Sequence, residues 1–205
     1  MRFAPLMLLL GLAFLLAACG DEDEAPPPSP TAVATATATP FPPVDGTVPA
    51  QGTGGTDPVD IKSNPDRVSG AATLVDVRVG AHPEQGGWDR IVFEFKDVRP
   101  AGRVDYVSGV SGCGSGLPVA LPGSAVLRVK FGATNAHDEQ GRVTIKGQPG
   151  NVPPQVSGPG NAILQSKQSC DFEALVEWGV GVRARQPFRV FLLDNPTRVV
   201  IDVKW

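Results

Sequence analysis

Apolar residues recur at every second position in short segments of the second half of the chain, and this period of two constrains the fold most strongly. Ile91, Phe93 and Phe95 are spaced in this way, and the apolar residues of 198–203 repeat the pattern. Because successive side chains of a β-strand point to opposite faces, each such segment turns one apolar set toward a core. No helical stripe longer than a few turns competes with this pattern. The sequence therefore predicts a nearly all-β fold.

Turn residues divide this part of the chain into strands that fit a small antiparallel β-sandwich. The Asp-Asn-Pro-Thr sequence at 194–197 has turn chemistry between two alternating runs, so we expect an antiparallel hairpin to close the chain. Residues 172–178 could instead form a short helix, but the Gly-Val-Gly-Val sequence that follows favours a strand. The predicted strands are 73–79, 90–95, 104–110, 125–131, 142–146, 163–177, 188–193 and 198–203.

The N-terminal residues 1–18 have the order of a secretory signal peptide. Arg2 supplies a positive charge, and the apolar run that follows, residues 6–18, is shorter than the roughly 20 residues of a membrane-spanning helix. The Leu-Ala-Ala-Cys sequence at 16–19 resembles the lipobox of bacterial lipoproteins, in which the cysteine thiol receives a diacylglyceryl group and becomes the new N-terminus. An ordinary signal with an incidental cysteine is the alternative. We predict an extracytoplasmic protein that is lipid-anchored to the bacterial membrane through Cys19.

A segment rich in Pro, Thr, Ala and Gly separates the anchor from the strands. It includes three consecutive prolines at 26–28 and the Gly-Thr-Gly-Gly-Thr sequence at 52–56. Such a composition buries too little apolar surface to offset the entropy of ordering the chain. We therefore expect residues 19–69 to form a disordered tether and residues 70–205 to form one globular domain.

Two cysteines remain once Cys19 is assigned to the lipid. Thiols outside the cytosol tend to be oxidised, so Cys113 and Cys170 are expected to form a disulfide. Two buried free thiols are the alternative. Neither cysteine has a histidine nearby in the sequence, which argues against cysteine catalysis and zinc binding.

The charge distribution argues against a nucleic-acid partner. The net charge is -3, and the acidic run at 21–24 accounts for that negative balance. The rest of the mature chain is close to neutral and lacks a basic footprint. We interpret the acidic run as a solvated spacer next to the membrane.

Catalytic and metal-binding readings of the sequence are weak. His137-Asp138-Glu139 could supply metal ligands, but adjacent residues cannot all reach one ion without a second element. The other histidine, His82, lies in a loop-like context. The glycine-rich sequence at 112–116 matches neither a nucleophile elbow nor a phosphate-binding loop, and a tight turn around Cys113 is the simpler account. The sequence therefore predicts no enzyme activity, no metal and no cofactor, and an enzyme of unrecognised type is the alternative.

Two segments resemble the AMIN-like domain family. The first is Gly-Trp-Asp-Arg-Ile-Val-Phe-Glu-Phe at 87–95, and the second is the hairpin at 188–203, with its Pro-Thr-Arg-Val-Val-Ile-Asp-Val end. The resemblance extends over about residues 72–205. It implies a non-catalytic β-sandwich that targets its protein by binding, with peptidoglycan as the suggested ligand. The alternative partner is an envelope protein that docks by adding a strand to an exposed sheet edge.

Candidate binding residues follow from the chemistry of a wall polymer. Sugars stack their apolar faces on exposed aromatic rings, and arginines hold carboxylates through paired hydrogen bonds. Core packing and surface ion pairs are the alternative roles, and the family pattern suggests that Asp89 and Arg90 pair with Asp202 and Arg198 as a structural lock. The candidates are Trp88, Asp89, Arg90, Tyr106, Trp178, Arg189, Arg198 and Asp202.

Overall fold

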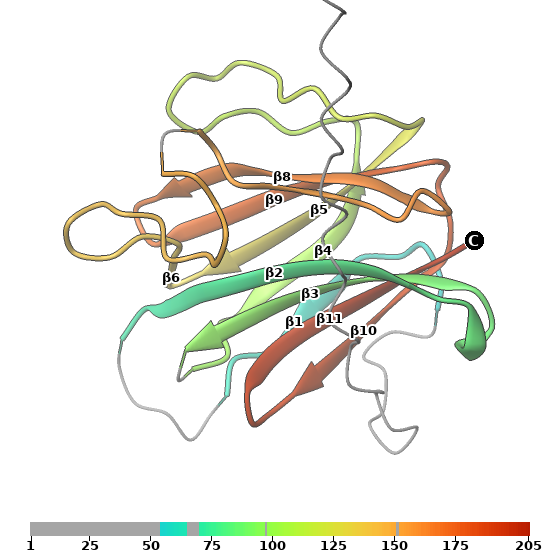
Figure 1. Ribbon diagram of the computed structural model, residues 1–205, viewed down its shortest axis with the longest axis horizontal. Coiled ribbons are helices and arrows are strands. Elements are labelled where there is room, and N and C mark those ends of the chain that lie inside the picture. Colours follow the sequence, from blue (N-terminus) through green and yellow to red (C-terminus); the bar gives the residue numbers. More distant parts are fainter. Residues whose placement is uncertain (1–53, 65–69, 97, 151) are drawn as a thin grey trace, which may run out of the picture. The chain divides into compact units, whose positions relative to one another are not determined.

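Two β-sheets face each other across a shared apolar core in the computed structural model (Figure 1). The structure describes residues 54–64, 70–96, 98–150 and 152–205. The expected signal peptide, Cys19 and residues 19–53 and 65–69 of the expected tether lie outside the described residues. Within the described ranges, no helix has the length and apolarity needed to cross a membrane. The predicted antiparallel β-sandwich is confirmed.

The first sheet has six strands in the order β1-β4-β5-β9-β8-β7, and the second has five in the order β10-β11-β3-β2-β6. Neighbouring strands are antiparallel, apart from the short parallel pairing of β2 with β6. The strands are β1 Val59–Ile61, β2 Ala72–His82, β3 Trp88–Lys96, β4 Gly102–Val107, β5 Ala125–Gly132, β6 Thr134–Asn135, β7 Gln155–Ser157, β8 Ile163–Phe172, β9 Leu175–Val182, β10 Phe188–Leu193 and β11 Thr197–Lys204. A short 3-10 turn, η1 Pro83–Gln85, joins β2 to β3.

The alternating apolar residues of β3 form the centre of the core, as predicted. Phe93 is fully buried and meets Phe131 and Trp178 edge to face, with ring centroids 5.2 and 5.8 Å apart. Phe95 packs against Phe131 in the same way at 4.9 Å. These rings join β3 of one sheet to β5 and β9 of the other, so the period of two in β3 fixes which face of the second sheet meets the first.

The predicted strand at 163–177 is two strands, β8 and β9, joined by a tight turn. Glu173 and Ala174 both have positive φ, 50° and 56°, which is the geometry of a two-residue hairpin turn. Strand was the correct choice over helix for residues 172–178. The turn was missed because neither residue is among the Gly, Asn and Asp types that usually mark it.

The predicted strand at 142–146 is wrong. Val143 forms an isolated bridge with His137, and the backbone amides of Thr144 and Lys146 donate to Ala136 and Val75 respectively. The hydrogen bonds of this segment thus go to two different partners, so it follows a loop and not a ladder. The predicted strand at 104–110 ends earlier, as β4 stops at Val107.

The ordered sheet begins before residue 70, where the domain was expected to start. β1 pairs with β4 within the segment expected to be tether, and Ile61 is only 3% exposed. The amide of Phe188 donates to Gly55 O at 2.8 Å. The alternation in β1 covers only Val59 and Ile61, which is too short a run to distinguish a strand from a tether by sequence.

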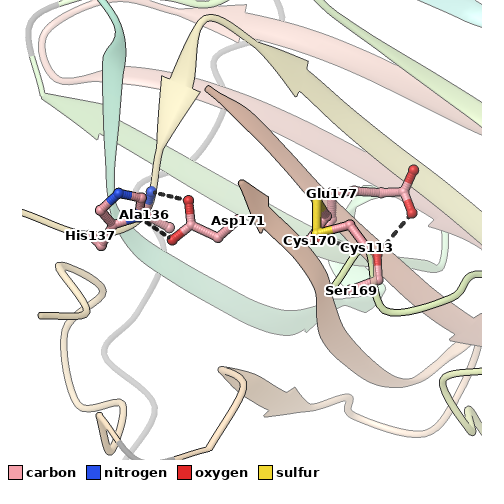
Figure 2. The surroundings of a disulfide bond; sticks show 7 residues. All are labelled: Cys113, Ala136, His137, Ser169, Cys170, Asp171 and Glu177. Atoms are coloured by element: carbon pink, nitrogen blue, oxygen red, sulfur yellow. Dashed lines mark hydrogen bonds and ion pairs between the residues drawn. A yellow bond between two sulfur atoms is a disulfide. The ribbon is translucent and has the colours of Figure 1, made fainter. Parts of the chain in front are cut away.

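The Cys113–Cys170 disulfide is confirmed, with the two Cα atoms 5.1 Å apart. It joins the long loop between β4 and β5 to β8 (Figure 2). The same loop packs on β9 at Gly179 and Gly181, where an added Cβ would lie 2.5 Å from Val110 and 2.3 Å from Pro122 O. The Gly-Val-Gly-Val sequence of β9 therefore alternates between valines in the core and glycines that admit this loop.

Candidate functional site

Three charged residues lie side by side across the outward face of the five-stranded sheet. The register places Arg189 of β10 opposite Asp202 of β11, and Asp202 opposite Arg90 of β3. Arg90 donates to both carboxylate oxygens of Asp202, at 2.6 and 2.8 Å, and Arg189 Nε donates to the same carboxylate at 3.0 Å. The predicted pairing of Arg90 with Asp202 is therefore present, and Arg189 takes the place that Arg198 was expected to occupy.

Arg90 and Asp202 are buried, so their role is structural. They are 1% and 0% exposed, so neither can meet a ligand directly, contrary to their inclusion among the binding candidates. Removing one partner of such a buried pair leaves an uncompensated charge, which is strongly destabilising. The Asp202 carboxylate also holds Arg189, which is more accessible, with 25% of its side chain exposed.

Asp89 faces the interior and is also excluded as a ligand-binding residue. It is fully buried and accepts hydrogen bonds from the amides of Ala162 and Ile163, at 2.7 and 2.9 Å, and from Asn161 Nδ2 at 3.1 Å. The carboxylate thus ties β3 to the start of β8 in the opposite sheet. It does not pair with the arginine expected from the family pattern.

Trp88 lies at the start of β3. It belongs to a cluster of aromatic and cationic side chains that we call the Trp88 patch: Trp88, Arg189, Lys204 and Trp205. The Arg189 guanidinium lies over the Trp88 ring at 4.2 Å, and Lys204 Nζ lies 5.6 Å from the same ring. Trp88 is half-buried, and Trp205 is 45% exposed. The patch thus combines a fixed cation with accessible indole surface.

A glycine at the turn before β3 sets the shape of the Trp88 patch. Gly87 has φ 77°, a conformation that favours glycine, and an added Cβ would lie 3.5 Å from the Trp205 ring. Trp205 N donates to Gly87 O at 3.1 Å, and Lys204 Nζ donates to Gly86 O. The C-terminal residues are therefore held against the turn that presents Trp88. Sequence reasoning missed Lys204 and Trp205, although both directly follow the alternating pattern of 198–203.

Trp178 and Arg198 do not contribute to the Trp88 patch. Trp178 is fully buried in the core against Phe93, so it cannot serve as a platform for a sugar. Arg198 lies opposite Glu94 in the register and donates to Pro196 O at 3.2 Å. Burial lowers the pKa of the Arg198 guanidinium. Its contacts place it near the β10–β11 turn, away from Trp88.

Tyr106 lies at the end of β4, outside the Trp88 patch. Its hydroxyl donates to Gln186 O at 2.7 Å and accepts from Gln186 N at 3.1 Å. The Arg185 guanidinium lies 4.9 Å from the ring centroid, and Phe188 meets the ring edge to face at 5.8 Å. Burial raises the pKa of the Tyr106 phenol above its ordinary value. Nothing in the sequence distinguished Arg185 as a neighbour of Tyr106.

His137 is paired with Asp171, the residue next to the disulfide on β8 (Figure 2). His137 Nδ1 lies 2.8 Å from Asp171 Oδ2, and Asp171 Oδ1 accepts from Ala136 N at 3.0 Å. Cys170 and Asp171 therefore anchor two different loops to consecutive positions of one strand. Among the residues that the structure describes, no group of three or more His, Cys, Asp or Glu side chains is placed to hold a metal ion.

The fold and these surfaces define a small antiparallel β-sandwich module that presents aromatic and cationic side chains at one end of a sheet. The family model of the AMIN-like domain matches residues 72–205, so the chain belongs to the AMIN-like domain family. Domains of this family are generally non-catalytic modules associated with the cell envelope. No curated protein and no solved structure matches the chain.

Proposed function

We propose that this protein is an envelope lipoprotein whose AMIN-like domain binds peptidoglycan through the Trp88 patch, as a non-catalytic localisation or accessory factor. The signal peptide at 1–18 directs export, the lipid on Cys19 anchors the chain, and the tether gives the domain reach toward the wall. The Cys113–Cys170 disulfide fits an extracytoplasmic location, where disulfides form and persist.

The observation that carries this proposal is the stacking of Arg189 on Trp88, with Arg189 held by Asp202. A sugar ring can stack on accessible indole surface while its carboxylate-bearing substituents meet the cations beside it. Asp202 is already shared by two arginines, so Lys204 and Arg189 leave the patch with a positive excess. Because Asp202 fixes Arg189, little side-chain entropy is lost when a ligand binds.

The test is co-sedimentation of the full-length protein with purified, protein-free peptidoglycan sacculi. Saturable binding should weaken by about tenfold or more in Trp88→Ala, since truncating a central aromatic residue of an interface often costs at least about 1.4 kcal/mol. Phe172→Ala is the matched control, because Phe172 is an aromatic residue that is 61% exposed and lies outside the patch. Equal loss in both variants, or no binding by the folded parent protein, would contradict the proposal.

The anchor has its own test. The Cys19→Ala variant should keep its signal peptide and take up no labelled lipid, whereas the parent chain should be processed and labelled. Unchanged membrane association of a processed Cys19→Ala protein would contradict the lipid anchor without affecting the assignment of the Trp88 patch.

The free edge of β10 favours a second candidate function, docking of an envelope protein by strand addition. The Phe188 amide points away from β11 toward Gly55, and by alternation the backbone groups of Val190 and Leu192 face the same edge. No described residue pairs with them, and Arg189 is the charged residue of this strand. If this function operates, a photo-crosslinking residue at position 193 in place of Leu193 should capture a protein in the native envelope. Crosslinking to wall polymer alone would argue against it.

A further inference from the structure

A hollow of about 700 Å³ opens between the end of β4, the start of β5 and the long loop that joins them. It shares no residue with the Trp88 patch. Tyr106 and Arg185 line one part of it, Ser108 and Ser124 contribute hydroxyl groups, and Val119 and Leu121 contribute apolar surface. The volume lies within the range of small-molecule sites.

The wall of this hollow is held in place at three points. Cys113 is bonded to Cys170, and Cys113 N donates to Ser169 O at 3.2 Å. The side chains of Val110 and Leu121 occupy the space above Gly179, where an added Cβ would lie 2.5 and 2.6 Å from them. Lys167 Nζ donates to Ala120 O at 2.9 Å. The loop is thus fixed in position by these contacts, although it contains no strand.

Tyr106 and Arg185 provide the recognition chemistry. The two hydrogen bonds between the Tyr106 hydroxyl and Gln186 fix the ring, and Arg185 is exposed above it with one long contact to Thr56 O at 3.4 Å. Arg185 is the charged side chain among the described residues that line the hollow, and no carboxylate lies among them. Its guanidinium is therefore available to an anion.

We propose that this hollow binds the free carboxylate end of a peptide with small apolar side chains, the chemistry of a peptidoglycan stem peptide. Arg185 pairs with the terminal carboxylate through its planar fork, and the valine, alanine and leucine surface receives the methyl groups. Ser108 and the nearby backbone supply hydrogen bonds to the peptide units. Ser124 Oγ already donates to Arg183 O at 2.6 Å, so it serves the ligand as an acceptor. The identity of the ligand rests on the proposed function, but the pocket can be tested separately.

The experiment is a titration of the full-length, oxidised protein with the pentapeptide L-alanyl-D-isoglutamyl-L-lysyl-D-alanyl-D-alanine, in parallel with its C-terminal amide. We expect the free acid to bind saturably and the amide at least about tenfold more weakly, because the charge-assisted pair is lost. Arg185→Gln should reduce affinity for the acid to that for the amide, and Arg185→Lys should restore only part of it. Arg142→Gln, an exposed arginine outside the hollow, is the matched control.

The two proposals fail in different ways. Equal affinity for acid and amide, or undiminished binding by Arg185→Gln, would overturn the assignment of the hollow while leaving binding of sacculi intact. A peptide from the C-terminus of an unrelated protein serves as a comparison. If it binds tightly and the stem peptide does not bind, the ligand of the hollow does not come from the wall. Failure of the parent protein to bind sacculi, together with binding of the pentapeptide, would instead contradict the role of the Trp88 patch.

Discussion

Arg90 and Asp202 lie opposite each other on β3 and β11 and are joined by two hydrogen bonds, of 2.6 and 2.8 Å, on a nearly inaccessible part of the sheet surface. Asp202 also holds Arg189, which stacks on Trp88. The buried pair therefore connects the stability of the sheet to the geometry of the Trp88 patch. A single carboxylate positions the cation that we assign to ligand binding.

Replacing Asp202 with Asn should destabilise the fold by about 3–5 kcal/mol, since Arg90 would keep its charge without its buried counterion. Urea unfolding followed by tryptophan fluorescence measures this change. Asp60→Asn is the control, because the Asp60–Arg103 pair is exposed and such pairs contribute about 1 kcal/mol or less. Similar losses in the two variants would show that the Arg90–Asp202 pair has no special structural role.

Removing the disulfide should cost about 4 kcal/mol of stability, because Cys113 and Cys170 are separated by 57 positions and their bond restricts the unfolded chain. The Cys113→Ser, Cys170→Ser double variant should show this loss, and reductant should then have no further effect on it. Alkylation of the folded parent protein without reductant should label neither cysteine. Labelling of both would show that the thiols are free.

The strands near the end of the chain were predictable because each of them carries its own signal. In β3 and β11 the alternation of apolar residues specifies the buried face, and the turn residues at 194–197 mark the hairpin. The disulfide followed from the number of cysteines and the expected compartment. These features depend on local sequence or on simple pairing, so they do not require knowledge of the tertiary structure.

The candidate site was less predictable because its members are brought together by the register between strands. Arg189 and Arg198 are equivalent by sequence, and only the pairing of β10 with β11 places Arg189 beside Asp202. Trp88 and Trp178 likewise both flank strand-like runs, yet Trp178 points into the core. Arg185 reaches Tyr106 from the connection at 183–187, and Trp205 reaches the Trp88 patch from beyond the end of β11. Neither position belongs to a strand, so no periodic pattern predicts where its side chain lies.

The packing of the long loop on β9 predicts that Gly179 tolerates no larger residue. Gly179→Val should displace Val110 and Leu121 and destabilise the protein by about 1–3 kcal/mol, as overpacking does. Gly132→Ala is the matched control on β5, since an added Cβ there meets nothing within 4 Å. Thermal unfolding checks both variants. Full tolerance of Val at Gly179 would show that the loop is not held against β9.

Tyr106 is the single tyrosine of the chain, so its ionisation can be followed directly by phenolate absorbance. Burial raises the pKa of Tyr106 above its ordinary value of 10.0, an effect that the hydrogen bond to Gln186 and the charge of Arg185 partly offset. Because the folded-state pKa is the higher one, the stabilising contribution is complete below the unfolded pKa and is lost as the pH rises through the folded pKa. Arg185→Gln should raise the pKa further by removing a nearby positive charge.

An absorbance titration of the phenol in buffer and in urea measures these shifts in the pKa of Tyr106. Identical midpoints in the two solvents would contradict the burial of this ring.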